Sequence, residues 1–94
     1  MEQIELQRAI EAILFAAGER VDVSRLCFAL EADEDEIIAA ADALCDQMAF
    51  ERRGIRLLKL ENAYQMVSSG EMADFVTKAL ETRKPPKLSS SQLE

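Results

Sequence analysis

The stretch from Asp33 to Arg53 constrains the fold most, because it is long and regular enough to predict one continuous helix. Asp33 stands where an N-cap residue is preferred, and Glu36 follows at the spacing of a capping box. Gly54 follows the stretch and predicts that the helix ends just before it. Apolar residues recur at helical spacing along one face, which predicts that the rest of the chain packs there: Ile37, Ala41, Leu44, Cys45 and Met48.

The same helix is acidic. Arg52 is its first basic residue, and all charged residues before it are carboxylates: Glu34, Asp35, Glu36, Asp42, Asp46 and Glu51. A helix that enters the major groove of DNA must face phosphates and base edges rich in hydrogen-bond acceptors. The charge pattern therefore argues against this helix as a DNA-reading element.

Two shorter helices are predicted before it. The first runs from about Glu2 to Ala17 and stops at Gly18, a residue type that favours helix ends. The second runs from Val23 to Leu30 behind Asp22 as N-cap, and a short extended piece at Arg20-Val21 precedes it. The expected buried residues of the two helices are Leu6, Ile10, Ile13, Leu14, Ala17, Leu26, Cys27 and Leu30.

Ile4 and Phe15 lie together on a different face of the first helix, roughly 120–140° away from Ile10 at about 100° per residue. One interpretation is that the first helix is central and buried on several sides. The alternative is that Ile4 and Phe15 contact another chain.

The apolar period changes after Gly54. Two strand-like runs, 55–60 and 64–68, are joined around Asn62-Ala63 and predict a β-hairpin. Both faces of the first run carry apolar residues: Ile55 and Leu57 on one face, Leu58 and Leu60 on the other. Because the register through the turn is open, the sequence does not decide which set faces the core. A two-stranded hairpin has one face to give to its own core, so the second face requires a partner if it is exposed.

A fourth helix is predicted from Gly70 to about Glu81, capped by Ser68 or Ser69. Its core-facing stripe is the most regular in the chain and contains Met72, Phe75, Val76, Ala79 and Leu80. The helix ends before the basic segment 83–87, whose two prolines prevent a helix from continuing. This segment is interpreted as a linker, and 89–94 as the beginning of a further helix.

Three helices followed by a hairpin are the element order of a winged helix-turn-helix. We therefore expect an α+β, mostly helical domain over residues 1–82, with a wing of two to three strands. Residues 83–94 are expected to form the basic, proline-containing linker and the start of a truncated second domain.

The composition excludes several functions. The net charge of −7 disfavours nucleic acid or an anionic membrane as the main ligand. No apolar run approaches the ~20 residues that span a bilayer, and no signal peptide opens the chain, so a cytoplasmic protein without a membrane partner is expected. Without histidine, the usual zinc ligand sets cannot form, and Cys27 and Cys45 are interpreted as buried free thiols.

No catalytic site is predicted. The chain has no histidine and no glycine-rich phosphate loop, and its carboxylates at 33–36 form a run that complements the helix dipole. Cys45 has no basic neighbour within a helical turn that could activate it as a nucleophile. We therefore expect no enzyme activity, no cofactor and no metal ion.

Basic residues gather at the base of the hairpin: Arg52, Arg53, Arg56 and Lys59. One interpretation is a patch for nucleic acid or for an acidic partner. The other is surface charge that balances the acidic helix, and the acidic composition of the whole chain favours it.

Three segments resemble the bacterial segregation and condensation protein B family. They are Ala12-Ile13-Leu14-Phe15-Ala16-Ala17-Gly18-Glu19 with Val21, the hairpin from Gly54-Ile55 to Ala63-Tyr64-Gln65-Met66, and Leu80-Glu81 with Arg83-Lys84-Pro85-Pro86-Lys87-Leu88-Ser89. The resemblance spans nearly the whole chain. It departs at Asn62-Ala63, where glycines are common, and at Leu58 and Val67, where polar residues are usual, so the departures concern the wing surface.

The resemblance implies a non-catalytic subunit of the prokaryotic condensin complex, acting in chromosome condensation and segregation. Such subunits carry two winged-helix domains, form a homodimer through the N-terminal one, and bind the kleisin subunit (segregation and condensation protein A). Through the kleisin they reach the structural-maintenance-of-chromosomes ATPase on the nucleoid. Some apolar residues have no place in the predicted core. These residues and the resemblance together give five candidates for protein interaction: Ile4, Phe15, Leu58, Leu60 and Val67.

A winged-helix transcription regulator that binds DNA directly is the competing hypothesis. The two differ in salt-dependent binding to duplex DNA, because a regulator loses affinity steeply as salt rises. The acidic helix favours the interaction module, for which no direct, specific nucleic-acid binding is expected.

Overall fold

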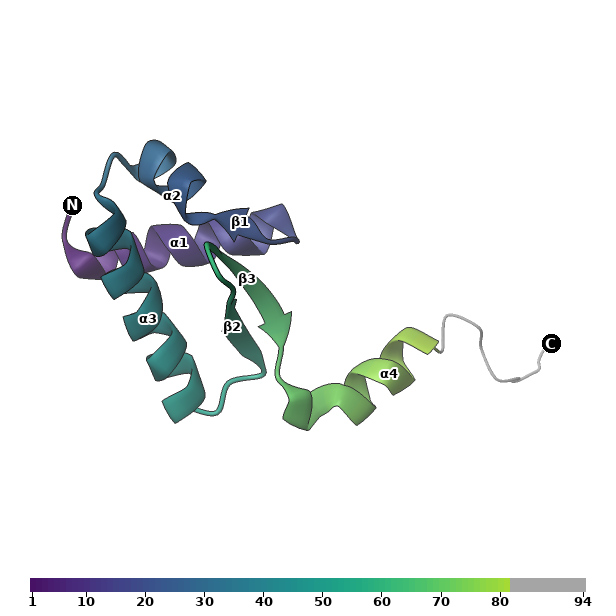
Figure 1. Cartoon of the computed structure of the whole chain (residues 1–94). Helices are drawn as coiled ribbons and strands as arrows, with labels where there is room; N and C mark the ends of the chain where they lie inside the picture. The colour runs from purple at the N-terminus through teal and green to yellow at the C-terminus, as the bar shows by residue number, and fades with distance from the viewer. Residues whose placement is uncertain (82–94) are drawn as a thin grey trace, which may run out of the picture.

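The computed structural model describes residues 1–81, and Figure 1 shows their arrangement. In these residues, α1 to α3 and a three-stranded sheet form one body, from which the last helix projects, so the predicted α+β winged helix-turn-helix is confirmed. The elements are α1 (Gln3–Ala17), β1 (Val21–Asp22), α2 (Val23–Leu30), α3 (Glu34–Phe50), β2 (Ile55–Lys59), β3 (Ala63–Ser68), the 3-10 helix η1 (Gly70–Met72) and α4 (Ala73–Glu81). The predicted linker and second-domain start at 83–94 lie outside the described residues.

The helix ends follow from local signals, with one exception. Gly18 ends α1 in the left-handed conformation at φ +67°, and its N–H donates to the Leu14 carbonyl at 3.3 Å. The capping box of α3 forms as predicted, with the Asp33 N–H donating to Glu36 Oε1 at 3.0 Å. The predicted end of this helix at residue 53 is wrong. The left-handed residue is Arg52 (φ 52°) rather than Gly54, so the helix stops at Phe50.

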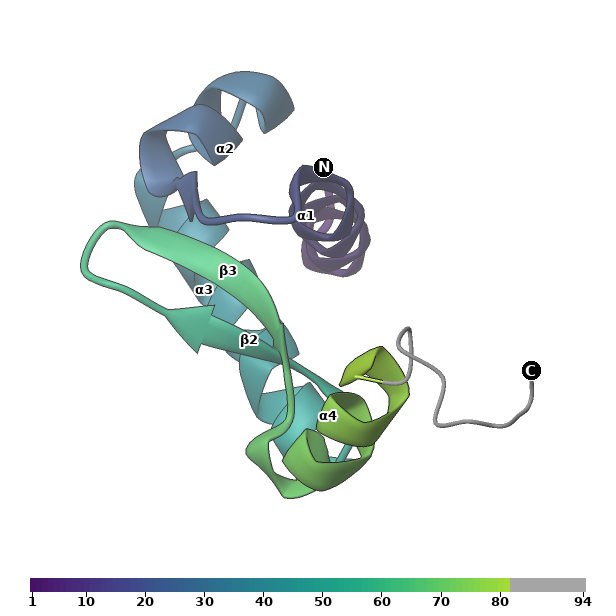
Figure 2. The same ribbon diagram turned by 90° about the vertical axis from the view of Figure 1, so that its right-hand side faces the viewer.

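The sheet settles which wing face is buried. Its strand order is β1-β3-β2, antiparallel throughout, and β1 supplies the third strand (Figure 2). Leu57 pairs with Met66 on the inner face and is buried, so the alternating residue Leu58 points outward. The Leu60 N–H donates to the Ala63 carbonyl at 2.8 Å and closes a two-residue turn at Glu61-Asn62, one residue earlier than predicted.

The core lies between α1, α2, α3 and the inner face of the sheet. The stripe predicted for α3 is largely confirmed, with Ile37, Ala41, Leu44 and Met48 buried, whereas Ala17 at the end of α1 is exposed. Tyr64 on β3 is buried and belongs to this core. The main buried apolar residues are Leu6, Ile10, Leu14, Val21, Val23, Leu26, Ile37, Ala40, Ala41, Leu44, Met48, Leu57, Ala63 and Tyr64.

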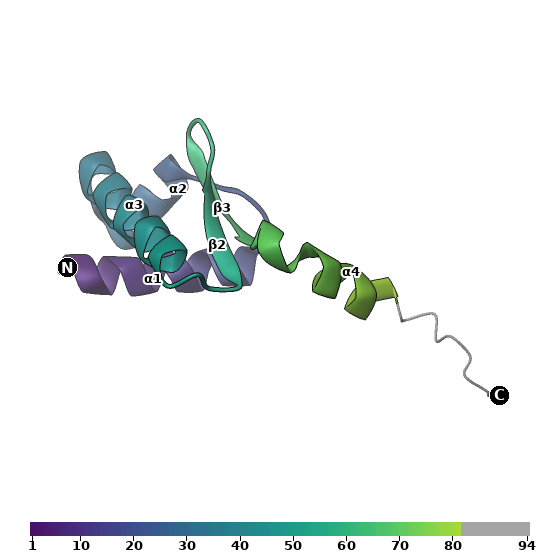
Figure 3. The same cartoon turned by 90° about the horizontal axis from the view of Figure 1, so that it is seen from below.

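The core stripe predicted for the fourth helix is wrong. No residue of α4 is buried, and Phe75 is 68% exposed. Two contacts anchor the helix near its start: the Ser69 N–H donates to the Gly54 carbonyl at 2.7 Å, and Arg52 pairs with Glu71 at 3.3 Å. Figure 3 shows α4 leaving the body beyond this anchor, in agreement with the exposure of Phe75 and Leu80.

Candidate protein-interaction surfaces

Three of the five predicted interaction residues come together on the outer wing face, which comprises Arg56, Leu58, Leu60, Gln65 and Val67. The register pairs Arg56 with Val67 and Leu58 with Gln65, so these side chains share the face opposite to Leu57. Leu58 is 44% exposed, and Leu60 and Val67 are half-buried. The departures from the family pattern at Leu58 and Val67 thus form one apolar patch on the solvent side of the hairpin.

The other two predicted residues lie on α1. Ile4 and Phe15 point in nearly the same direction, about 20° apart at about 100° per residue, but they are separated by about 16 Å along the helix. Both are exposed, so the interpretation that α1 is buried on this side is wrong. Phe15 borders the α1 groove, an open groove of about 320 Å³ lined by Arg8, Glu11, Ala12, Phe15 and Met66.

The five residues therefore form two separate surfaces. Met66 belongs to the inner face of the sheet, because it pairs with Leu57, and it lines the α1 groove together with Phe15. Leu58, Leu60 and Val67 lie on the opposite face of the same sheet. One flat partner surface cannot contact both groups at once.

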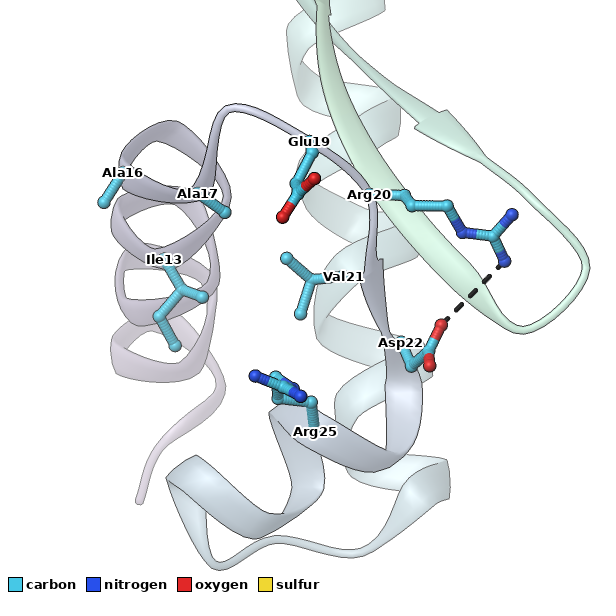
Figure 4. Close-up of a pocket in the computed structure, with 8 residues that line it drawn as sticks. All are labelled: Ile13, Ala16, Ala17, Glu19, Arg20, Val21, Asp22 and Arg25. Atoms are coloured by element: carbon cyan, nitrogen blue, oxygen red, sulfur yellow. Dashed lines mark ion pairs between the residues drawn. The ribbon is translucent and has the colours of Figure 1, made fainter.

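A third surface was not predicted from the sequence. An open hollow of about 690 Å³ lies between the end of α1 and the β1–α2 segment, lined by Ile13, Ala16, Ala17, Glu19, Arg20, Val21, Asp22 and Arg25. Figure 4 shows Glu19 and Val21 turned toward α1, while Arg20 and Asp22 turn to the other side and form an ion pair at 3.8 Å. The sequence feature that accompanies this hollow is the pair of small residues Ala16 and Ala17 before Gly18. Their side chains are too short to fill the space beside the end of α1. Apolar and charged side chains therefore both line this hollow.

Three of the four basic residues at the hairpin base are paired with carboxylates, whereas Arg56 donates from Nε to the Arg53 carbonyl at 2.9 Å. Lys59 Nζ lies 3.2 Å from Asp42 Oδ2, and Arg53 contacts both Glu51 at 2.7 Å and Glu11 at 4.0 Å. The hydrogen bond from Arg53 lowers the pKa of Glu51. The pairs with Asp42 and Glu51 support the interpretation that the basic residues balance the acidic helix, whereas Glu11 and Glu71 lie outside it.

Cys27 and Cys45 are free thiols in the described chain. The structure brings no three metal-ligating side chains together within residues 1–81. Cys27 and Cys45 are half-buried rather than fully buried; Cys45 Sγ donates to the Leu57 carbonyl at 3.3 Å. Burial and the nearby Glu34 and Asp33 raise the pKa of Cys27, which disfavours its reactive thiolate. None of the helices described is both long and apolar enough to cross a membrane.

These features define a class: a winged-helix domain with an acidic third helix and several uncovered apolar surfaces, which is suited to binding proteins. The chain belongs to the family described as segregation and condensation complex subunit ScpB, whose model matches residues 8–94.

Relatives and solved structures agree with this family. The chain is 31% identical over 96 residues to segregation and condensation protein B of Clostridioides difficile, with 100% of this chain and 54% of the relative covered. It is 35% identical over 94 residues to the protein of the same name from Lachnoclostridium phytofermentans, with 100% and 50% covered. The chain thus spans about half the length of these relatives.

Two solved structures share the fold. The crystal structure of ScpB from Mycobacterium tuberculosis has a TM-score of 0.86 at 24% identity, over 96% of this chain and 56% of that one, and supports the fold alone. The crystal structure of a dimer of the ScpB N-terminal domain complexed with a ScpA peptide has a TM-score of 0.72 at 31% identity, over 78% of this chain and 91% of that one.

Proposed function

We propose that this chain is the N-terminal part of a non-catalytic subunit of the prokaryotic condensin complex, which forms a homodimer and binds the kleisin subunit. The observation that carries the proposal is the 31% identity to an ScpB N-terminal domain solved as a dimer with a ScpA peptide. Through the kleisin, the subunit is joined to the structural-maintenance-of-chromosomes ATPase on the nucleoid and acts in chromosome condensation and segregation. Residues 83–94 then form the linker and the start of a second winged-helix domain, in agreement with relatives about twice as long.

The charges support a protein partner over DNA. The first turn of α3 carries Glu34, Asp35 and Glu36, all exposed, where a DNA-reading helix would present basic or neutral polar groups. The nearby cations Arg53 and Lys59 are already paired with carboxylates. The competing transcription-regulator hypothesis therefore finds no basic reading surface in residues 1–81.

The two separate surfaces support two partners. A second copy and a kleisin segment both need apolar contact area, and a standard interface removes roughly 800 Å² per partner. We infer that Leu58, Leu60 and Val67 on the outer wing face contact one partner, and Ile4 and Phe15 on α1 the other. Two-fold symmetric dimers are the commonest way in which such a small domain covers apolar surface.

The dimer is tested by light scattering across a hundredfold dilution from about 100 µM, a range that brackets µM affinities. If the outer wing face is the dimer contact, Leu58→Asp shifts the equilibrium toward monomer without unfolding the domain, because Leu58 points to solvent. Ile55→Asp is the matched control, since Ile55 lies on the same strand with nearly equal exposure (43% against 44%) but on the other face. A wild-type chain that is monomeric at the highest concentration refutes the dimer, whereas a dimer that tolerates Leu58→Asp places its interface elsewhere.

The kleisin and DNA partners are tested separately. Sedimentation of the chain with and without the middle segment of the kleisin is expected to show a heavier complex only when that segment is present. Fluorescence anisotropy with duplex DNA is expected to show almost no binding at physiological salt. Specific DNA binding that weakens steeply with salt would instead support the transcription-regulator hypothesis.

A further inference from the structure

The apolar face of α4 carries large side chains that are exposed to solvent. Phe75 is 68% exposed and Leu80 59%, and Val76 between them is half-buried. Figures 1 and 3 both show α4 extending away from α1 to α3 and from the sheet, in agreement with the exposure of Phe75 and Leu80. An amphipathic helix with its apolar face in water is unfavourable, and such a face marks an interaction site.

The α1 groove is a matching receptor on the same molecule. Its walls are Phe15, which is 77% exposed, and Met66, and its floor includes the small side chain of Ala12. A small residue between two large apolar ones lets a helix approach closely. The anchor at Ser69 and Glu71 carries α4 away from its own groove, so the groove is open to a helix from elsewhere.

We propose that α4 packs its apolar face into the α1 groove of a second copy, so that two copies exchange their α4 arms. This inference rests on the homodimer proposed above and assigns an interface to it. Every copy has both an α4 and an α1 groove, so each α4 contacts a surface unlike itself. When two copies exchange their α4 helices, the same contact forms twice and the dimer is two-fold symmetric.

The charges at the edges of the two elements fix a direction. Arg8 precedes Glu11 along α1, whereas Asp74 precedes Lys78 along α4. If α4 lies parallel to the partner's α1, each residue meets an opposite charge. In the antiparallel orientation, like charges meet. Charge complementarity of this kind sets orientation and register across an interface.

The exposed apolar side chains supply part of the area that a stable contact needs. An aromatic side chain buries roughly 150–250 Å², so the exposed parts of Phe75, Phe15 and Leu80 together offer on the order of 400 Å² per copy. That is about half of the roughly 800 Å² per partner of a standard interface. The remaining area has to come from neighbouring atoms of α1, β3 and α4 if the exchanged dimer is stable.

The first test compares three single substitutions in the 94-residue chain by sedimentation equilibrium. Phe75→Asp and Leu80→Asp are expected to raise the dimer Kd more than about tenfold, because each places a charge in an apolar contact. Thr77→Asp is the matched control, since it adds the same charge to the polar face of the same helix, and it is expected to change the Kd less than about twofold. All three residues are exposed in one copy, so circular dichroism of the dilute variants checks that the monomer fold is unchanged.

The second test addresses the groove and the direction. Arg8→Asp is expected to weaken the dimer, and adding Asp74→Arg to it is expected to restore the wild-type Kd, because the pair is then reversed across the interface. Benzoylphenylalanine at position 75, irradiated in a mixture of ¹⁵N-labelled and unlabelled chains, is expected to link the two isotopic forms through the peptide that contains residues 8–15 or Met66.

Each outcome decides the proposal. A wild-type dimer that is insensitive to Phe75→Asp and Leu80→Asp overturns the arm exchange and leaves the proposed homodimer standing. Loss of kleisin binding without any change in dimerisation assigns α4 to the kleisin and also overturns the exchange. Crosslinks confined to one chain show that α4 folds back onto its own body. A wild-type chain that never dimerises overturns both this inference and the homodimer.

Discussion

The hydroxyl of Tyr64 donates a hydrogen bond to Asp42 Oδ1 at 2.9 Å and so ties β3 to α3. Tyr64 is only 1% exposed, while Asp42 is partly exposed and also pairs with Lys59. Tyr64→Phe therefore removes one bond to a charged group without leaving a buried carboxylate alone. The expected loss is about 1–2 kcal/mol, the lower part of the range for such bonds. For a domain of this size, that loss lowers the Tm by roughly 5–15 °C.

The same contact predicts a specific alkaline response. Burial, followed by the hydrogen bond to Asp42 and its charge, raises the pKa of Tyr64 in the folded chain. An unfolded tyrosine loses its proton near pH 10. Above that pH the unfolded chain binds fewer protons than the folded one, so the stability present at lower pH is lost progressively as pH rises through the folded-state pKa.

The assay is direct because Tyr64 is the sole tyrosine and the chain has no tryptophan. The ultraviolet band of tyrosinate, followed against pH in buffer and in concentrated urea, is expected to appear at higher pH in buffer. The difference between wild type and Tyr64→Phe isolates the tyrosine contribution to the fall in stability. A double-mutant cycle with Asp42→Ala should give a coupling of about 1 kcal/mol. Equal titration in buffer and urea, or an unchanged Tm in Tyr64→Phe, would refute the reasoning.

Three further predictions are measured by urea unfolding of dilute protein, followed by circular dichroism. Leu44→Ala should destabilise the domain by about 2–5 kcal/mol because Leu44 is buried, whereas Phe75→Ala should stay within about 0.5 kcal/mol; equal losses would contradict the exposure of α4. Glu36→Ala should cost about 0.5–2 kcal/mol more than Glu34→Ala, because both remove a carboxylate from the first turn of α3 but only Glu36 accepts from the Asp33 N–H; equal losses would argue against the capping box. Glu31→Gly should stabilise by up to about 1 kcal/mol, since Glu31 is left-handed at φ 51°, and a loss would show that the side chain itself contributes.

Local sequence signals determined most of the elements. The capping pair Asp33 and Glu36, the terminator Gly18 and the serine cap before residue 70 all form as predicted, because each acts within a few residues of chain. Apolar periodicity also identified the inward face of α3, since α3 has core on that side. The carboxylates of α3 led to the prediction that this helix does not read DNA.

Only the tertiary structure decided where the apolar faces go. Periodicity shows that a helix has an apolar face but not what covers it, which is why the stripe of α4 was assigned to the core although Phe75 is exposed. The pairing of Leu57 with Met66, and hence the outward direction of Leu58, depends on the strand register set by the turn at residues 61–62. The bond between Tyr64 and Asp42 joins residues that are distant in sequence, and no local pattern encodes such contacts. The chain itself specifies which residues are apolar; the packing of α1 to α3 against the sheet specifies which of them remain for a partner.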